Sequence, residues 1–177
     1  MTMDEKTNRH RDTARAIADT GVVLTEGEIA AIEVVDFGLG DFEREGLGIV
    51  VYVNTDRYCA KELVMLPGQA CPQHRHPPVG EDPGKTETFR CRRGVCYLFL
   101  DGPATPDPQV APPDGKAAVY TAARQIVLRP GEQFTIPPDT WHWFRAGPEG
   151  AIVSEFSSTS RDEADVFADP AVRRVET

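Results

Sequence analysis

Short apolar runs alternate with turns rich in glycine and proline along most of the chain. The sequence holds 15 glycines and 15 prolines, which interrupt these runs throughout. Many short strands joined by tight turns, such as one at Gly94, are typical of a sandwich or a barrel. We therefore predict an all-β fold with strands over residues 33–37, 47–54, 61–66, 86–91, 95–100, 119–120, 125–128, 133–136, 141–145 and 151–156.

Helical patterns occur near the N-terminus. Residues 4–19 carry a weak apolar stripe and predict one helix. Thr25 and Glu28 have the spacing of a capping box, so they predict a second short helix over residues 26–32.

A similar signal lies near the C-terminus. Ser160 and Glu163 also have the spacing of a capping box, which predicts a short helix over residues 161–168. The stretch 101–115 contains five prolines and is expected to be a surface loop.

The length of 177 residues predicts one domain, because a domain averages about 150 residues. Within residues 1–177 we expect a helical N-terminal extension over 1–32, a barrel over 33–157 and a C-terminal helical tail over 158–177. No internal repeat and no linker interrupts this order.

Charge and composition exclude several classes of function. The formal net charge is −9, so the chain lacks the basic surface that binds a phosphate backbone, and we expect no nucleic-acid partner. No apolar run is long enough to span a bilayer, and the polar N-terminus does not resemble a secretory leader. We expect a cytoplasmic protein whose four cysteines form no disulfide.

Three of the four histidines lie in two strand-like stretches. His74 and His76 are two residues apart, so on a strand both imidazoles face the same side. Glu87 follows this pair, and His142 ends the second stretch. Three imidazoles and one carboxylate brought together bind a divalent transition metal, and Mn, Fe, Co, Ni and Zn all suit this set better than Mg or Ca.

Both stretches resemble the two motifs of the cupin superfamily. The residues that match these motifs are Gly68, His74, His76, Glu87 and Gly94 in the first, and Gly131, Pro137 and His142 in the second. The resemblance implies a single double-stranded β-barrel, or jelly roll, with the metal inside one mouth.

The sequence departs from the cupin motifs at three points. Asp139 stands at a usual glycine and Ala146 at a usual asparagine. The gap between His76 and Glu87 is also longer than in the motif, which leaves Glu81 and Asp82 as rival ligands.

A narrower resemblance extends over most of the chain. Residues 51–61, 66–92 and 155–163 are similar to the D-lyxose ketol-isomerase family, in which the long gap is normal. This resemblance implies that Glu87 is the carboxylate ligand. It also implies a manganese-dependent enzyme that interconverts D-lyxose and D-xylulose, and D-mannose and D-fructose. The difficult species in such a reaction is a cis-enediolate, which a divalent cation stabilises.

Four further residues are candidates for this chemistry. Glu155 resembles the family's catalytic carboxylate, which implies that it moves the carbon-bound proton. Lys85 stands two residues before Glu87 and is expected to face the same side. Lys61 is aligned with apolar residues of its own strand; each lysine either binds a sugar oxygen or is an ordinary solvated lysine. Arg161 is either a substrate clamp or a charge at a helix terminus.

Two other functions fit the same four ligands. Relatives with three histidines and one glutamate include non-haem Fe(II) dioxygenases, and a non-catalytic cupin that binds a sugar or a metal is also consistent. The polar candidates Lys61, Lys85 and Glu155 favour a monosaccharide over the apolar substrate of a dioxygenase.

Trp141 and Trp143 alternate with His142, so on a strand both face away from the metal. An outward aromatic pair packs under a helix or against another subunit. This pattern is a hint of a homodimer.

Overall fold

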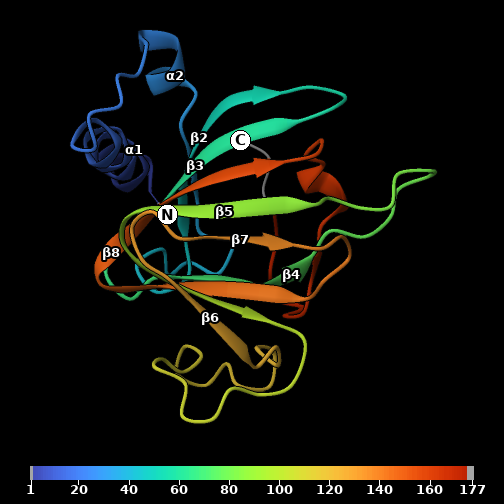
Figure 1. Cartoon of the computed structure of the whole chain (residues 1–177). Helices are drawn as coiled ribbons and strands as arrows, with labels where there is room; N and C mark the ends of the chain where they lie inside the picture. The colour runs from blue at the N-terminus through green and yellow to red at the C-terminus, as the bar shows by residue number, and fades with distance from the viewer. Residues whose placement is uncertain (1, 175–177) are drawn as a thin grey trace.

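The computed structural model describes residues 2–174 (Figure 1). Residue 1 and residues 175–177, at the ends of the predicted extension and tail, lie outside the described residues. The elements are α1 (Met3–Ala18), α2 (Glu26–Ala30), β1 (Glu33–Val35), β2 (Leu47–Asn54), β3 (Cys59–Met65), β4 (Ala70–Arg75), β5 (Glu87–Leu100), β6 (Arg124–Leu128), β7 (Gln133–Ile136), β8 (His142–Ser157), η1 (Asp162–Ala164) and β9 (Val166–Phe167).

Two long strands, β5 and β8, form the spine of the sheet. They pair along almost their whole length, from Glu87 with Ser157 to Leu100 with His142. The first half of β5 also pairs with β7 and its second half with β6, while the two halves of β8 pair with β4 and β3. Each spine strand therefore runs through two layers of the sheet. The first layer continues from the spine into β3, β2 and β1, and the second layer continues into β4 and β9. The predicted all-β barrel is confirmed.

The predicted turn at Gly94 is wrong. The β5–β8 ladder continues through this residue with two register shifts, so β5 replaces the strands predicted over 86–91 and 95–100. A Cβ at Gly94, where φ is +69°, would lie 2.0 Å from the carbonyl oxygen of Gly150. Bulges let a strand bend without ending, and glycine permits the close approach of β5 and β8 at the bend.

Side chains from both layers meet in one buried core. It includes Ile49, Leu63 and Phe89 from the first layer and Cys71, Leu98 and Phe144 from the second. The four cysteines are buried and, as predicted, form no disulfide. The barrel also buries charged and polar side chains, which are Lys61, His74, His76, Lys85, Glu87, His142 and Glu155. Buried charged groups are rare unless they are paired or bind a metal, so this set marks a candidate site.

The N-terminal helices lie on the outer face of the first layer (Figure 1). Thr2 caps α1 through a capping box with Glu5, and the predicted box of Thr25 and Glu28 at α2 is confirmed. Ile17 of α1 is fully buried against apolar side chains of β2, β3 and β8. Among residues 2–174, no helix has both the length and the apolar composition needed to cross a membrane.

The predicted C-terminal helix over 161–168 is wrong. The chain forms only the three-residue 3₁₀ turn η1 and then the short strand β9, which pairs with β4. Ser160 does not cap a helix, because its hydroxyl bonds to the side chains of Lys61 and Asp162. Phe167 of β9 packs against the core, so the segment after β8 lies against the barrel.

The chain itself covers Trp143. This residue faces away from the histidines, as predicted, and lies under the long connection over 101–123. Its ring stacks on Phe99 with 3.9 Å between centroids, and its indole N–H donates to the carbonyl of Ala122. The strand predicted over 119–120 is wrong, because these residues belong to the same connection. Trp143 therefore gives no support for a homodimer, and the homodimer stays a prediction.

Tyr120 ties this connection to a buried carboxylate. Its hydroxyl donates to Glu45 Oε1 at 2.7 Å, and Lys116 Nζ lies 3.4 Å from Oε2. We expect Tyr120→Phe to lower the free energy of unfolding by about 1.5–3 kcal/mol, because a hydrogen bond to a buried charged group is lost. Urea unfolding measures this change, with the exposed Tyr58→Phe as control. Equal unfolding midpoints for the two variants would contradict it.

Candidate metal centre and active site

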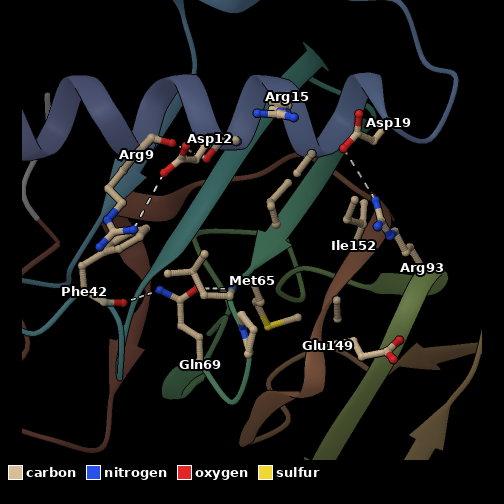
Figure 2. Close-up of a pocket in the computed structure, with 16 residues that line it drawn as sticks. Arg9, Asp12, Arg15, Asp19, Phe42, Met65, Gln69, Arg93, Glu149 and Ile152 are labelled. Atoms are coloured by element: carbon tan, nitrogen blue, oxygen red, sulfur yellow. Dashed lines mark hydrogen bonds and ion pairs between the residues drawn. The ribbon is translucent and has the colours of Figure 1, made fainter.

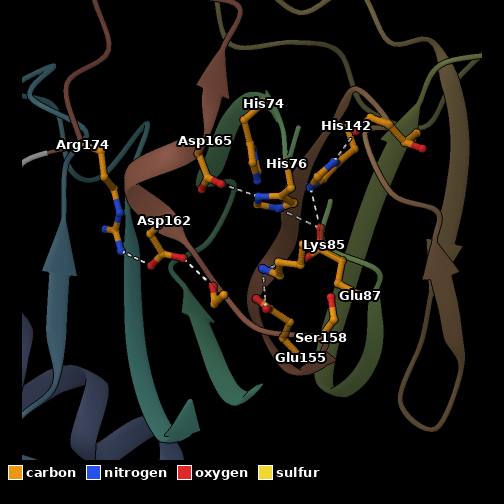
Figure 3. A network of polar contacts seen from close by, with 12 residues as sticks. His74, His76, Lys85, Glu87, His142, Glu155, Ser158, Asp162, Asp165 and Arg174 are labelled. Carbon is orange, nitrogen blue, oxygen red and sulfur yellow. Dashed lines mark hydrogen bonds and ion pairs between the residues drawn. The ribbon is translucent and has the colours of Figure 1, made fainter. Parts of the chain in front are cut away.

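Three buried imidazoles meet where β4 pairs with β8. His74 lies on β4 and His76 just beyond its end, while His142 begins β8 directly opposite His74. One ring nitrogen of each lies within 4.8 Å of those of the other two, and none of the three residues is more than 7% exposed. The structure thus brings together the histidines of both sequence stretches (Figure 3).

A second contact orients each imidazole. The Nδ1 atoms of His74 and His142 lie 2.8 and 2.9 Å from the carbonyl oxygens of Pro72 and Thr140, and Nδ1 of His76 lies 2.5 Å from Asp165 Oδ1. Because an oxygen acceptor requires a proton on Nδ1, Nε2 is the ring atom that would bind a cation. Nε2 of His76 lies 3.1 Å from Glu87 Oε1, and a metal bound there would displace any proton from this nitrogen.

Glu87 brings a carboxylate to the same point. Its Oε1 lies 3.1 Å from His76 Nε2 and 3.0 Å from His142 Nε2. Two donor atoms bound at right angles to one metal, each at about 2.1 Å, are about 3.0 Å apart, so this spacing fits a shared cation. The contact of buried His142 Nε2 with Glu87 Oε1 lacks the geometry of a hydrogen bond, and a cation between the two atoms would satisfy this nitrogen.

The rival carboxylates lie elsewhere. Glu81 is exposed on the loop between β4 and β5, and Asp82 is paired with Arg161. Of the three acids considered, the structure therefore brings only Glu87 to the histidines.

Burial and nearby charges set the protonation of this cluster. Burial, reinforced by the other imidazoles, holds the pKa of His74 well below its ordinary value. Burial also acts to lower the pKa of His76, but Glu87 and the hydrogen bond to Asp165 outweigh it and raise that pKa to about 9. Burial acts to raise the pKa of Glu87, yet Lys85 and the adjacent imidazoles hold it well below its ordinary value. The carboxylate is therefore an anion, as a metal ligand must be.

Lys85 joins Glu87 to Glu155. Its Nζ lies 3.0 Å from Glu87 Oε2 and 2.7 Å from Glu155 Oε1. Burial acts to lower the pKa of Lys85, but the two carboxylates raise it well above its ordinary value. At 7% exposure this residue is not a solvated lysine. The three groups form one buried bridge that ends at the histidines (Figure 3).

Lys61 faces Glu155 across the β3–β8 ladder. Its Nζ lies 2.8 Å from Ser160 Oγ and 3.1 Å from Asp162 Oδ1, and the side chain is 5% exposed. It too is not a solvated lysine. It lines one cavity together with Lys85, Glu155, His74 and His76.

Comparison with known proteins identifies the family. The family model described as D-lyxose isomerase matches residues 26–177. The chain belongs to the D-lyxose isomerase family. It is 58% identical over 162 residues to the D-lyxose ketol-isomerase of Cohnella laeviribosi, covering 92% of this chain and 89% of that protein. It is 58% identical over 160 residues to the D-lyxose/D-mannose isomerase of Thermosediminibacter oceani, covering 90% and 88%. The predicted family is confirmed.

A solved structure shares the fold of this D-lyxose isomerase family member. The L-ribose isomerase of Acinetobacter sp. DL28, in complex with L-ribose, matches with a TM-score of 0.82 over 97% of this chain and 94% of that chain. Its sequence identity is 20%, so the likeness bears on the fold alone. The predicted cupin-type barrel is confirmed.

Sequence reasoning missed three polar residues of the family member's cavity. Asp162, Asp165 and Arg174 come from the segment after β8 and line the cavity with the predicted residues. Burial acts to raise the pKa of Asp162, but Lys61, Ser160 and Arg174 hold it far below its ordinary value. Acidic residues are favoured in the first turn of a helix, so Asp162 and Asp165 fitted the helix predicted over 161–168. Their sequence positions therefore gave no sign that they line the site.

Arg161 lies at the rim of the cavity. Its guanidinium pairs with Asp82, and 37% of its side chain is exposed. It lines a small rim hollow that it shares with His76 and Lys85. Contact with a substrate stays a prediction for this residue.

A separate groove of about 270 Å³ lies between α1 and the sheet (Figure 2). Met65 contributes to its floor, and charged residues at its rim pair with one another, Arg9 with Asp12 and Arg93 with Asp19. None of the predicted site residues lines this groove. The buried cluster, rather than the larger groove, is therefore the candidate active site of this family member.

Proposed function

We propose that this chain is a metal-dependent aldose–ketose isomerase that interconverts D-lyxose and D-xylulose, and D-mannose and D-fructose. The contact of Lys85 with both Glu87 and Glu155 carries the proposal. Through this lysine, the carboxylate that can transfer a proton is linked to the cation site, and all three groups lie in one buried cavity. The activities named for the two relatives support the choice of sugar. A cytoplasmic location and the absence of a nucleic-acid partner stay predictions from the sequence.

The proposed metal ligands are His74, His76, His142 and Glu87. This set suits Mn²⁺, which we favour, and also accepts Fe, Co, Ni or Zn. When bound, the metal supplies positive charge that stabilises the cis-enediolate formed as the sugar loses its C2 proton. Asp165 contacts Nδ1 of His76 and so holds the ring with Nε2 directed at Glu87 and the proposed metal.

Glu155 is proposed to move the proton between C2 and C1. Its side chain is 5% exposed, so a proton taken from one carbon exchanges slowly with water and is available to the other. Lys85 positions this carboxylate and presents a charge to a sugar oxygen. Lys61, held by Asp162, is proposed to bind a second sugar oxygen, and Arg161 to hold the substrate from the rim.

Removal of the metal is expected to abolish isomerisation, and added Mn²⁺ to restore it, because the enediolate loses its counter-charge. The protein is treated with a chelator, dialysed and assayed for ketose formation on a panel of aldopentoses and aldohexoses with each divalent ion in turn. D-Lyxose and D-mannose, which share the C2 configuration, are expected to react. Failure to convert any aldose with any of the ions would contradict the proposal.

The same assay under strict anaerobiosis separates the other functions. An isomerase is expected to keep its full activity, whereas a dioxygenase consumes oxygen and stops without it. A non-catalytic cupin would bind metal and sugar, measured by calorimetry, without forming ketose.

A further inference from the structure

One turn presents His142 to the other two histidines. β7 ends at Ile136 and β8 begins at His142, so residues 137–141 place this imidazole. Asp139 in this turn has a φ of +54°, in the left-handed region that few residues other than glycine adopt. It stands where the cupin motif has its usual glycine, and this backbone conformation explains that preference. Aspartate tolerates the conformation better than most residues, and it adds a carboxylate that glycine lacks.

The same turn sets the orientation of the His142 ring. Its Nδ1 lies 2.9 Å from the carbonyl oxygen of Thr140, the residue that follows Asp139. A rotation of the backbone at Asp139 would therefore move both the start of β8 and the acceptor that orients the ring. The placement of this imidazole depends on a residue whose backbone conformation costs free energy and must be held by its surroundings.

Arg75 joins this turn to β4. It lies between His74 and His76, so alternation along the strand directs its side chain to the opposite face. Its guanidinium pairs with the carboxylate of Asp139 and lies over the ring of Trp141, 5.2 Å from the centroid. Its Nε is buried, so the side chain lies along the protein surface instead of extending into solvent. One side chain from the segment of two histidines thus contacts the turn that carries the third.

We propose that Arg75 is a positioning residue of the metal centre. Through Asp139 and Trp141 it holds the turn against β4, which fixes the imidazole of His142 opposite the other two. The side chains of the ion pair are 31% and 38% exposed, so the pair contributes little to the free energy of folding. Its effect is expected in the affinity for the metal, because outer residues that orient metal ligands change that affinity by about 10–100-fold. The inference rests on the proposed function through its metal centre alone, and not through the sugar.

Charge and positioning predict opposite results for Arg75→Gln. If only charge mattered, removal of a nearby cation would strengthen the binding of Mn²⁺. Positioning predicts binding that is weaker by roughly tenfold or more. Asp139→Asn keeps a residue that tolerates the left-handed conformation, and it weakens binding in both cases. The double variant Arg75→Gln/Asp139→Asn leaves the net charge unchanged, so charge alone predicts the affinity of the wild type, whereas positioning predicts weaker binding.

Calorimetric titration with Mn²⁺ alone tests the inference. The wild type, the two single variants and the double variant are freed of metal with a chelator and titrated at one pH and ionic strength. Urea unfolding of the metal-free proteins is measured beside it. Arg75→Gln is expected to unfold close to the wild-type midpoint, because the lost ion pair is partly exposed. A lower affinity is then not a consequence of lost folding.

Arg124→Gln is the matched control. Arg124 lies on β6 in the same row of the sheet as His142, with Leu100 between them, so its substitution removes the same charge two strands away. Its guanidinium also lies over an aromatic ring, 6.0 Å from the centroid of Phe134, but it lines no part of the catalytic cavity. This variant is expected to bind Mn²⁺ as tightly as the wild type or more tightly.

Weaker binding by both Arg75→Gln and the double variant supports the inference. An Arg75→Gln protein that binds Mn²⁺ at least as tightly as the wild type overturns it and leaves the proposed function standing. A double variant with wild-type affinity overturns it as well. A wild type that binds no divalent ion overturns the proposed function and this inference together.

If circular dichroism shows that Arg75→Gln does not fold, Asp139→Asn decides the question. Its charge control is Glu81→Gln, which removes an exposed acid from the loop between β4 and β5. A greater loss of Mn²⁺ affinity in Asp139→Asn than in this control supports the inference, and an equal affinity of the two variants overturns it.

Discussion

Glu155→Gln is expected to lower kcat on D-lyxose by roughly 10²–10⁴-fold, the range for loss of a group that transfers protons. The amide occupies the same space as the carboxylate but cannot accept the C2 proton. Sugar affinity is expected to be largely kept, because Lys85 retains Glu87 as a counter-charge 3.0 Å away. Steady-state kinetics with Mn²⁺ and calorimetric titration of D-lyxose measure the two quantities separately.

Glu149→Gln is the matched control for this substitution. Glu149 lies on the same strand, β8, but is exposed and outside the cavity. The kcat of the Glu149→Gln enzyme is therefore expected to equal that of the wild type. The metal content of both variants is measured, because a lost metal would also lower kcat. A Glu155→Gln protein that binds metal normally and keeps wild-type kcat would show that another group moves the proton.

Spacing along one strand was enough to predict part of the candidate site. His74 and His76, like Lys85 and Glu87, are two residues apart, and alternation along a strand puts each pair on one side. The structure has both pairs facing the same cavity. Such pairs are predictable because the pleat of a strand depends on local backbone geometry alone.

Contacts between distant segments left no comparable signal. Asp165 reaches His76 only because β9 pairs with β4, and nothing near residue 165 indicates that pairing. Ser160 and Glu163 have the spacing of a capping box, yet β pairing and the burial of Phe167 outweigh this local preference.

The number of strands was also beyond local reasoning. In the sequence, Gly94 indicates a change in the direction of the chain, which is equally consistent with a turn and with a bulge. The partner strand decides between them, since β8 continues to pair with β5 on both sides of the bend. The predicted strands over 86–91 and 95–100 therefore lie in the right place but form one strand, as do those over 141–145 and 151–156, whereas residues 119–120 form no strand.

Lys85→Met is expected to lower the free energy of unfolding by about 3–5 kcal/mol, because it leaves buried carboxylate charge without its partner. Glu155 loses the ammonium 2.7 Å from its Oε1, and Glu87 the one 3.0 Å from its Oε2. Glu87 keeps the imidazoles of His76 and His142, so the larger part of the loss falls on Glu155. Urea unfolding in the presence of a chelator measures the change without a contribution from metal binding.

The double variant Lys85→Met/Glu155→Gln tests whether unpaired charge, rather than lost packing, causes this instability. Glutamine carries no charge, so the double variant is expected to regain much of the stability that Lys85→Met loses. Glu155→Gln alone completes the cycle, because it leaves Lys85 paired with Glu87. If the double variant is no more stable than Lys85→Met, packing explains the loss. The charged bridge would then not hold Glu155 beside the cation site, and the proposed transfer of a proton between C2 and C1 would lose its structural basis.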